Sequence, residues 1–162
     1  MSRWRPPGKQ ASPYITAQGY QKLEAELAHL WKKRRIVNDA LSAAAAEGDR
    51  SENAEYIYRK KEQAGIDRRI RYLQKRLPDL KVVTNVASQE QIFFGAWVTV
   101  DIEGETKEYR IVGPDEADSI QNLISVDSPF ARALLKLRVD DTCKVRVNNT
   151  ETLGFVRAIR YQ

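Results

Sequence analysis

The sequence predicts an α+β protein: an N-terminal antiparallel helical hairpin, forming a coiled coil, followed by a compact α+β domain. Apolar residues recur at alternating spacings of three and four along two runs, which indicates two long amphipathic helices. From Lys81 onward the sequence changes to short segments typical of β-strands. We therefore expect a basic flexible tail over residues 1–14, the hairpin over 15–80 and the second domain over 81–162. Helices of about 30 residues would make the hairpin project roughly 45 Å.

The first apolar stripe predicts a helix that begins near Thr16, a good N-cap residue, and ends near Glu47. Arg34 is the only polar residue in this stripe, and Gly48 follows the helix as a C-cap glycine would. The stripe consists of Tyr20, Leu23, Leu27, Leu30, Val37, Leu41 and Ala44. A helix cannot bury such a stripe alone, so it requires a second helix beside it.

The second stripe predicts that partner helix, which Pro78 should end close to Leu77. Arg59 and Gln63 occupy the positions between its apolar members. Gly65 should cost about 1 kcal/mol relative to alanine within a helix, and tight packing or a slight bend would account for it. The stripe consists of Tyr56, Ile66, Ile70, Leu73, Leu77 and Leu80.

The C-terminal part should contain several strands and one short helix. Pro129 near the first turn and the alanine and leucine content that follows predict the helix over 129–139. Asn148-Asn149 should connect the two strands of a closing hairpin. We expect Phe94 and Trp97 in the core, and Cys143 as a small strand residue. The expected strand segments are 92–94, 97–100, 106–112, 120–126, 143–147 and 153–161.

Composition excludes several classes of site. The chain has 27 Lys and Arg against 22 Asp and Glu, a net charge of +5 that weakly favours polyanionic partners. One cysteine and one histidine, Cys143 and His29, cannot form a disulfide framework or a cysteine-rich zinc site. There is no apolar run long enough to span a bilayer and no signal-peptide core near Met1, so we expect no membrane partner and a cytoplasmic setting.

The segment between the helices, GDRSENAEY (48–56), concentrates acidic and polar residues at an apex. One interpretation is structural, because Asp49 or Ser51 could cap the second helix and Asp49 with Glu52 has capping-box spacing. The other is functional: two exposed carboxylates at the start of a helix could face one way, and such hard oxygen ligands suit Mg²⁺. Two carboxylates alone would hold Mg²⁺ poorly, so another molecule would have to complete the site.

Behind this apex the second helix is strongly basic. A charge run on a helix is often only a solvated face, but cations close to an acidic apex could also bind a phosphate chain. The candidate residues for that role are Arg59, Lys60, Lys61 and Arg68.

Several long motifs resemble the bacterial Gre transcript-cleavage factors over nearly the whole chain after the tail. The motifs are GDRSENAEY, DRRIRYL (67–73), FFGAWV (93–98) and DSPFARALLK (127–136). Leu30-Trp31 and GDRSEN make the chain similar to the GreB type more than to GreA. The resemblance implies that the C-terminal domain is FKBP-like and docks on RNA polymerase, while the coiled coil enters the secondary channel. Asp140-Asp141 departs from the usual pattern near the docking surface.

By position, the resemblance makes Asp49 and Glu52 the catalytic acidic pair, which helps hold a second Mg²⁺ jointly with the polymerase. Ser51 and Asn53 would support this tip, and the basic residues would contact the 3′ end of backtracked nascent RNA. Asp127, Ser128 and Pro129 match the loop used for polymerase docking. We thus expect a monomeric, non-enzymatic cofactor that binds no metal stably alone and stimulates transcript hydrolysis by the polymerase, rescuing arrested complexes.

Two alternatives stay open. A channel-binding regulator of the same fold would inhibit the polymerase, and its tip would lack this acidic pair or trap the metal unproductively. A coiled-coil adaptor would instead bind nucleic acid through the second helix alone, without a polymerase.

Overall fold

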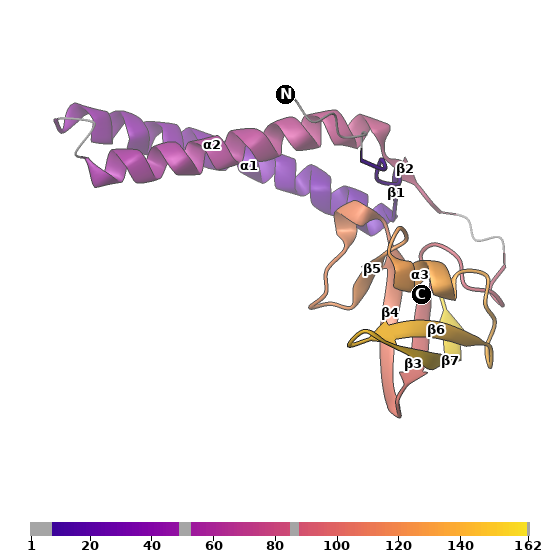
Figure 1. Cartoon of the computed structure of the whole chain (residues 1–162). Helices are drawn as coiled ribbons and strands as arrows, with labels where there is room; N and C mark the ends of the chain where they lie inside the picture. Colours follow the sequence, from indigo (N-terminus) through magenta and orange to yellow (C-terminus); the bar gives the residue numbers. More distant parts are fainter. Residues whose placement is uncertain (1–7, 49–52, 85–87, 162) are drawn as a thin grey trace, which may run out of the picture. The chain divides into compact units, whose positions relative to one another are not determined.

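The computed structural model describes residues 8–48, 53–84 and 88–161. The chain divides into two compact units, one formed by Tyr20–Leu80 and the other by Met1–Gly19 together with Lys81–Gln162 (Figure 1). No helix in the described ranges is both long and apolar enough to cross a membrane. The expected α+β class is confirmed, with a helical hairpin before a sheet domain.

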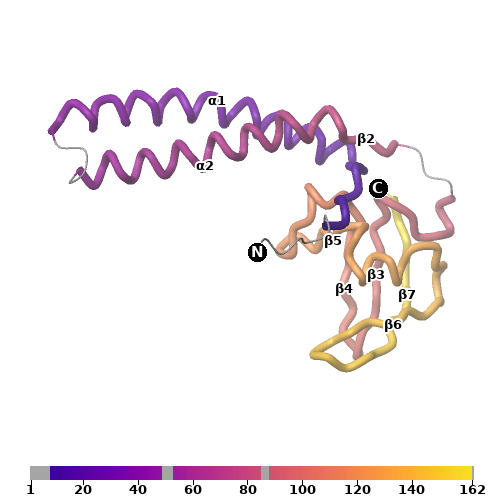
Figure 2. The backbone as a smooth tube through the Cα atoms, turned by 45° about the horizontal axis from the view of Figure 1, so that its top comes forward, coloured from indigo at the N-terminus to yellow at the C-terminus, as the bar shows by residue number. Residues whose placement is uncertain are grey.

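The first unit is the predicted hairpin. Helices α1 (Ala17–Ala46) and α2 (Ala54–Arg76) run side by side in both views (Figures 1 and 2), and the 3₁₀ turn η1 (Leu77–Asp79) follows. Both predicted stripes supply the buried residues, so burial of apolar area holds the pair together. These residues are Leu23, Val37, Ala44, Ile66, Ile70, Leu73 and Leu77.

Polar pairs between the helices fix their register. Arg34, the polar residue of the first stripe, donates from Nε to Asp67 Oδ1 at 2.6 Å. Arg69 donates from Nε to Glu26 Oε1 at 2.6 Å, farther from the connection between the helices. A slip of one heptad along either helix would keep apolar residues opposite one another but separate these charged partners, so the ion pairs favour the observed alignment.

The ends of the helices follow the sequence signals. Thr16 caps α1, because its Oγ1 accepts a hydrogen bond from the backbone N–H of Gly19 at 3.0 Å. The helix ends at Ala46, and Gly48 has a φ of 137°, where glycine is favoured. Pro78 lies in η1 directly after α2, which confirms that it stops the helix.

The second unit contains a five-stranded sheet in the order β5-β4-β3-β7-β6, parallel only between β4 and β5. The short helix α3 (Pro129–Leu134) contributes Ala131 and Leu134 to the core beside Val98, Val100 and Val156 of the sheet. The strands are β3 (Trp97–Ile102), β4 (Glu105–Val112), β5 (Leu123–Ser125), β6 (Thr142–Val147) and β7 (Thr150–Arg160). A second 3₁₀ turn, η2 (Pro114–Glu116), follows β4.

The hairpin of β6 and β7 turns at Asn148 and Asn149, with φ values of 48° and 63°. Asparagine tolerates this left-handed conformation, which a two-residue hairpin turn requires, so the predicted closing hairpin is confirmed. Cys143 is a buried residue of β6, as expected. Burial raises the pKa of its thiol, and the hydrogen bond with the Gly154 backbone only partly offsets that effect.

Several details differ from the sequence expectations. Residues 92–94 form no strand, and of the strand predicted over 120–126 only Leu123–Ser125 forms one, β5. The helix expected over 129–139 ends at Leu134, because Leu135 has the extended ψ of 137°. Trp97 lies between the guanidinium groups of Arg110 and Arg160 rather than in the core, and Phe94 is likewise only half-buried beside Tyr14.

The N-terminal residues pack within this second unit. Strand β1 (Tyr14–Ile15) pairs in parallel with β2 (Lys81–Val82). The Glu116 carboxylate accepts hydrogen bonds from the backbone N–H and the hydroxyl of Thr16, at the start of α1. A Cβ on Gly19 would lie 2.0 Å from Glu116 Oε1, so this approach requires glycine. Residues placed in the tail by sequence thus form ordered contacts from Ser12 onward.

Gly65, within α2, lowers the stability of the helix relative to alanine. A Cβ built there meets nothing within 4 Å, which excludes tight packing, one of the two explanations that the sequence left open. We predict that Gly65→Ala raises the free energy of unfolding by about 0.5–1 kcal/mol, because alanine has the higher helix propensity and restricts the unfolded chain. Thermal and urea denaturation would measure it. Gly19→Ala is the contrasting control, and an unchanged or lower stability for Gly65→Ala would contradict the prediction.

Candidate functional site

The acidic residues predicted to act at the tip, Asp49 and Glu52, lie outside the described residues, as does Ser51. The structure instead defines the two points between which that segment runs. One is the end of α1, followed by Gly48, and the other is Asn53, the last residue before α2.

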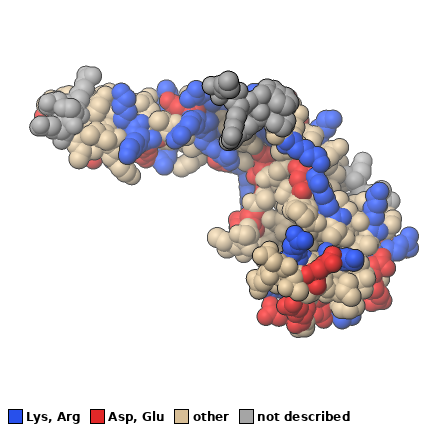
Figure 3. All heavy atoms as spheres, viewed as in Figure 1, with Lys and Arg blue, Asp and Glu red and all other residues tan. Residues whose placement is uncertain are grey.

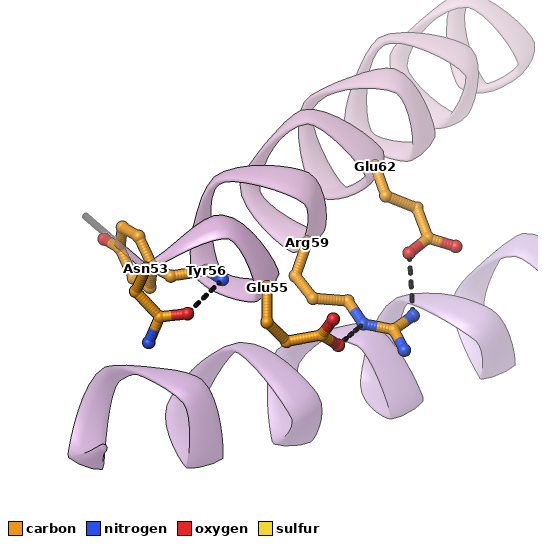
Figure 4. Close-up of polar contacts among 5 residues, drawn as sticks. All are labelled: Asn53, Glu55, Tyr56, Arg59 and Glu62. Carbon is orange, nitrogen blue, oxygen red and sulfur yellow. Dashed lines mark hydrogen bonds and ion pairs between the residues drawn. The ribbon is translucent and has the colours of Figure 1, made fainter. Parts of the chain in front are cut away.

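Asn53 ties the two helix ends together with one side chain. Its Oδ1 accepts a hydrogen bond from the backbone N–H of Tyr56 at 3.1 Å, which makes it the N-cap of α2 (Figure 4). Its Nδ2 donates to the Ala44 carbonyl near the end of α1 at 2.7 Å. Each helix terminus leaves backbone groups without an intrahelical partner. Asn53 satisfies one such group at the start of α2 and is a second donor to the Ala44 carbonyl, which also accepts from the Glu47 N–H at 3.2 Å. The Asn53 amide therefore links the end of α1 to the start of α2.

The position of the cap corrects one sequence expectation. Asp49 and Ser51 were candidates to cap the second helix, but Asn53 is its N-cap. Helix α2 begins at Ala54, and the direction in which the two carboxylates face lies outside the described residues. Sequence reasoning missed the cap because three residues of types favoured at this position, Asp49, Ser51 and Asn53, occur within five, and spacing cannot choose among them.

The guanidinium of Arg59 is already paired with two carboxylates. Its Nε donates to Glu55 Oε1 at 2.8 Å and its Nη1 donates to Glu62 Oε2 at 3.0 Å, both within α2 (Figure 4). The side-chain hydrogen bond to Glu55, and then that to Glu62, raise the pKa of Arg59 above its ordinary value. Two carboxylates thus compete with any phosphate for this guanidinium.

The other predicted basic residues fall into two groups. Lys60 lies over the ring of Tyr56, with Nζ 5.6 Å from the ring centroid. Lys61 and Arg68 are exposed, and within the described ranges no acidic side chain pairs with either. They are seven residues apart, two helical turns, so they share one face of α2.

That face continues beyond the predicted patch. Four exposed cations follow it, and we call them the cationic stripe: Lys61, Arg68, Arg71 and Lys75. Lys and Arg side chains recur along the hairpin in Figure 3. From Lys61 to Lys75 the stripe extends about 21 Å at the rise of an α-helix. A seven-residue spacing visible in the sequence could have identified Lys75 as the fourth member.

One aromatic residue near the tip was also missed. Tyr58 is 61% exposed, and its ring lies beneath the Arg59 guanidinium at 5.6 Å from the ring centroid. Exposed aromatic rings among cations are typical of surfaces that bind single-stranded nucleic acids, where bases stack on the rings. The sequence signal was Tyr58 lying outside the apolar stripe.

The predicted docking residues occupy the connection between β5 and α3. Ser128 caps α3 by accepting a hydrogen bond from the Ala131 N–H at 3.1 Å, and Pro129 is the first residue of that helix. Asp127 accepts hydrogen bonds from both the backbone N–H and the hydroxyl of Ser12. Its partial burial acts to raise the pKa of Asp127, but the Ser12 bonds, Arg132 and Lys9 outweigh burial and lower it.

No metal site is complete in the described part of the chain, where no three His, Cys, Asp or Glu side chains are grouped. The acidic pair itself belongs to the undescribed segment 49–52. Its donor chemistry, two carboxylates without histidine or cysteine, fits a hard cation such as Mg²⁺ that is also bound by another molecule.

Comparisons with known proteins agree over both units. A family model for the N-terminal part of transcription elongation factors matches residues 13–82, and the GreA/GreB C-terminal model matches residues 87–161. A solved structure, GreA factor homolog 1 of Thermus thermophilus, aligns with 26% identity over 91% of this chain and 97% of that one, at a TM-score of 0.42.

Curated relatives named transcription elongation factor GreB are much more similar. That of Xanthomonas axonopodis is 58% identical over 87% of this chain and 86% of its own length. The Pseudomonas aeruginosa protein is 53% identical over 99% of this chain and 98% of its own length. Two matching domain models and full-length relatives of this similarity establish the family: the chain belongs to the GreA/GreB transcription elongation factors and is similar to their GreB members.

Proposed function

We propose that this protein binds RNA polymerase, places its helical hairpin in the secondary channel and stimulates hydrolysis of backtracked nascent RNA. The family membership supports the polymerase as partner, and the hairpin supplies a stiff arm. The observation that carries the proposal is the Asn53 side chain, which links the end of α1 to the start of α2 at the connection whose sequence carries Asp49 and Glu52. The protein alone would have no turnover.

Asp49 and Glu52 would act as the missing ligands for a second Mg²⁺ in the polymerase active centre. When bound, this ion lowers the pKa of its water and stabilises negative charge on the reacting phosphate. The two carboxylates would help hold the ion, and one of them could orient the attacking water through a hydrogen bond. Ser51 could add a polar contact, whereas Asn53 would act by fixing the base of the segment.

The cationic stripe would bind the phosphates of the extruded RNA 3′ segment. Lys61 and Arg68 suit this role because their charges are not offset by acidic neighbours in the described part of the chain. Arg59 would contribute mainly by ordering the first turns of α2, through its bonds to Glu55 and Glu62. Tyr58 could stack on an RNA base beside them.

The β5–α3 connection would dock on the polymerase. Asp127 presents a carboxylate kept ionised by its hydrogen bonds, and Ser128 with Pro129 fixes the start of α3 beside it. A negative side chain on a rigid turn suits a cationic group of the partner.

A stalled, backtracked elongation complex tests the whole proposal. Adding the protein with Mg²⁺ should release short 3′-terminal RNA fragments, and omitting either should prevent this. Binding to the polymerase with inhibition of cleavage would instead identify the inhibitory regulator. High-affinity RNA binding without the polymerase would identify the adaptor.

The tip carboxylates are the first target. We predict that Asp49→Asn or Glu52→Gln abolishes stimulated cleavage while polymerase affinity changes little, because each amide keeps the shape but loses the charge that the ion requires. Cleavage gels and a competition binding assay would measure both quantities. Glu24→Gln, a carboxylate elsewhere on α1, is the matched control. Normal cleavage by both tip variants would remove this role.

Asn53 should behave differently from the carboxylates. We predict that Asn53→Ala lowers stimulated cleavage at saturating protein and lowers hairpin stability by about 1 kcal/mol, the usual effect of losing an N-cap. Asn53→Asp keeps the cap oxygen but loses the donor to Ala44, so it should retain most stability and still cleave poorly. Full cleavage by Asn53→Asp would show that the tie to α1 is dispensable.

Substitutions can test the contribution of the cationic stripe to cleavage separately from that of Arg59. We predict that Lys61→Ala with Arg68→Ala weakens stimulated cleavage and reduces its dependence on salt, because two phosphate contacts are lost. Arg59→Ala should have a smaller effect on that salt dependence. Lys22→Ala with Lys32→Ala removes equal charge from exposed positions of α1. An equal loss in this control would mean that only net charge matters.

A further inference from the structure

Ser12, in the N-terminal segment, contacts the proposed docking turn at Asp127. Ser12 donates its backbone N–H to Asp127 Oδ2 at 2.8 Å and its hydroxyl to Asp127 Oδ1. The two residues are 115 positions apart in the sequence. Each oxygen of the carboxylate therefore receives one donor from the same residue, which fixes both the position and the plane of the group.

The backbone around Asp127 is already held by its own turn. The Asp127 N–H donates to Ser125 Oγ at 3.1 Å, and the Ser128 N–H donates to the Ser125 carbonyl at 2.9 Å. Val126 donates to the Val112 carbonyl at 2.8 Å, which attaches the turn to the sheet. None of these bonds fixes the Asp127 side chain. Ser12 supplies that constraint.

The bond pattern leaves the carboxylate able to bind a partner. An ionised carboxylate offers about four lone-pair sites, and the two Ser12 donors use one on each oxygen. Asp127 is only half-buried, so the remaining sites can receive donors from another molecule. The N-terminal segment is itself anchored where β1 pairs with β2, so Ser12 is not a loose donor.

We propose that Ser12 is a positioning residue for polymerase docking, holding the Asp127 carboxylate in the orientation that receives a cationic group of the partner. This inference rests on the proposed docking role of the β5–α3 connection. It assigns a function to the part of the N-terminal segment that sequence patterns placed in a tail.

Affinity for the polymerase provides the first test. Ser12→Ala should weaken binding about five- to tenfold, as expected for losing one hydrogen bond of ordinary net strength. Cleavage at saturating protein should be unchanged, because the tip is untouched. Ser12→Thr keeps the hydroxyl and should restore affinity. Ser119→Ala, an exposed serine elsewhere in this unit, is the matched control and should bind normally.

The titration of Asp127 in the free protein provides a readout without the polymerase. The groups that act on this carboxyl besides Ser12 are Lys9 in the N-terminal segment and Arg132 on α3. Removing the Ser12 hydroxyl should raise the pKa of Asp127 toward its ordinary value, which NMR of the carboxyl carbon would detect. Polymerase binding by Ser12→Ala should then fall at a higher pH on acidification than in the unaltered protein.

The outcomes distinguish the role of Ser12 from the proposed docking role of the β5–α3 connection. If Asp127→Asn weakens binding and Ser12→Ala does not, the docking turn stands and the role of Ser12 is wrong. If neither weakens binding, the docking role itself fails. Tighter binding by Ser12→Ala would show that Ser12 competes with the partner, which also overturns the proposal.

Discussion

One side chain, Asn53, links the two helix ends at the connection of the hairpin. A coiled coil of two chains can end anywhere, but a hairpin must return its chain within one short connection. The Asn53 amide joins the Ala44 carbonyl to the Tyr56 N–H at the point of return. Its effect depends on register, because the two helices must end level for one side chain to reach both.

Charged pairs well behind the tip restrict the register further than the apolar contacts do. A shift by a whole heptad would again place apolar residues opposite apolar residues. Arg34 with Asp67, and Arg69 with Glu26, do not tolerate it. Such partly exposed ion pairs contribute modestly to stability, yet they penalise misalignment because a shifted helix would leave each charge without its partner. Specificity of alignment and strength of association therefore come from different residues.

Sequence patterns predicted the elements that repeat and failed on those set by a single contact. Periodicity identified both helices, and Pro78 and Asn148-Asn149 marked a stop and a turn because backbone chemistry acts locally there. The cap of α2 and the pairing of Arg59 depend on which of several equivalent neighbours comes closest, which spacing does not determine. Trp97 was expected in the core because its size suggests burial, but its ring stacks with two arginines on the sheet.

The contact between Ser12 and Asp127 was beyond sequence reasoning altogether, since no local pattern joins positions so far apart. It arises because β1 adds to β2 and brings the N-terminal segment to the β5–α3 connection. The acidic pair shows the complementary case. The role of the pair as ligands was predicted from residue type and from the family resemblance. The backbone conformation of Gly48 and the capping by Asn53, on either side of the pair, were seen only in the structure.

Cys143 has a practical consequence. It is the chain's single cysteine, it is 5% exposed within β6, and burial disfavours its thiolate. Thiol-directed reagents attack the thiolate of accessible cysteines, so this side chain should be nearly inert in the folded protein. A cysteine engineered on an exposed position of either helix would then react selectively in an otherwise unaltered chain. Fluorescent or cross-linking labels could therefore report where the arm lies within a transcribing complex.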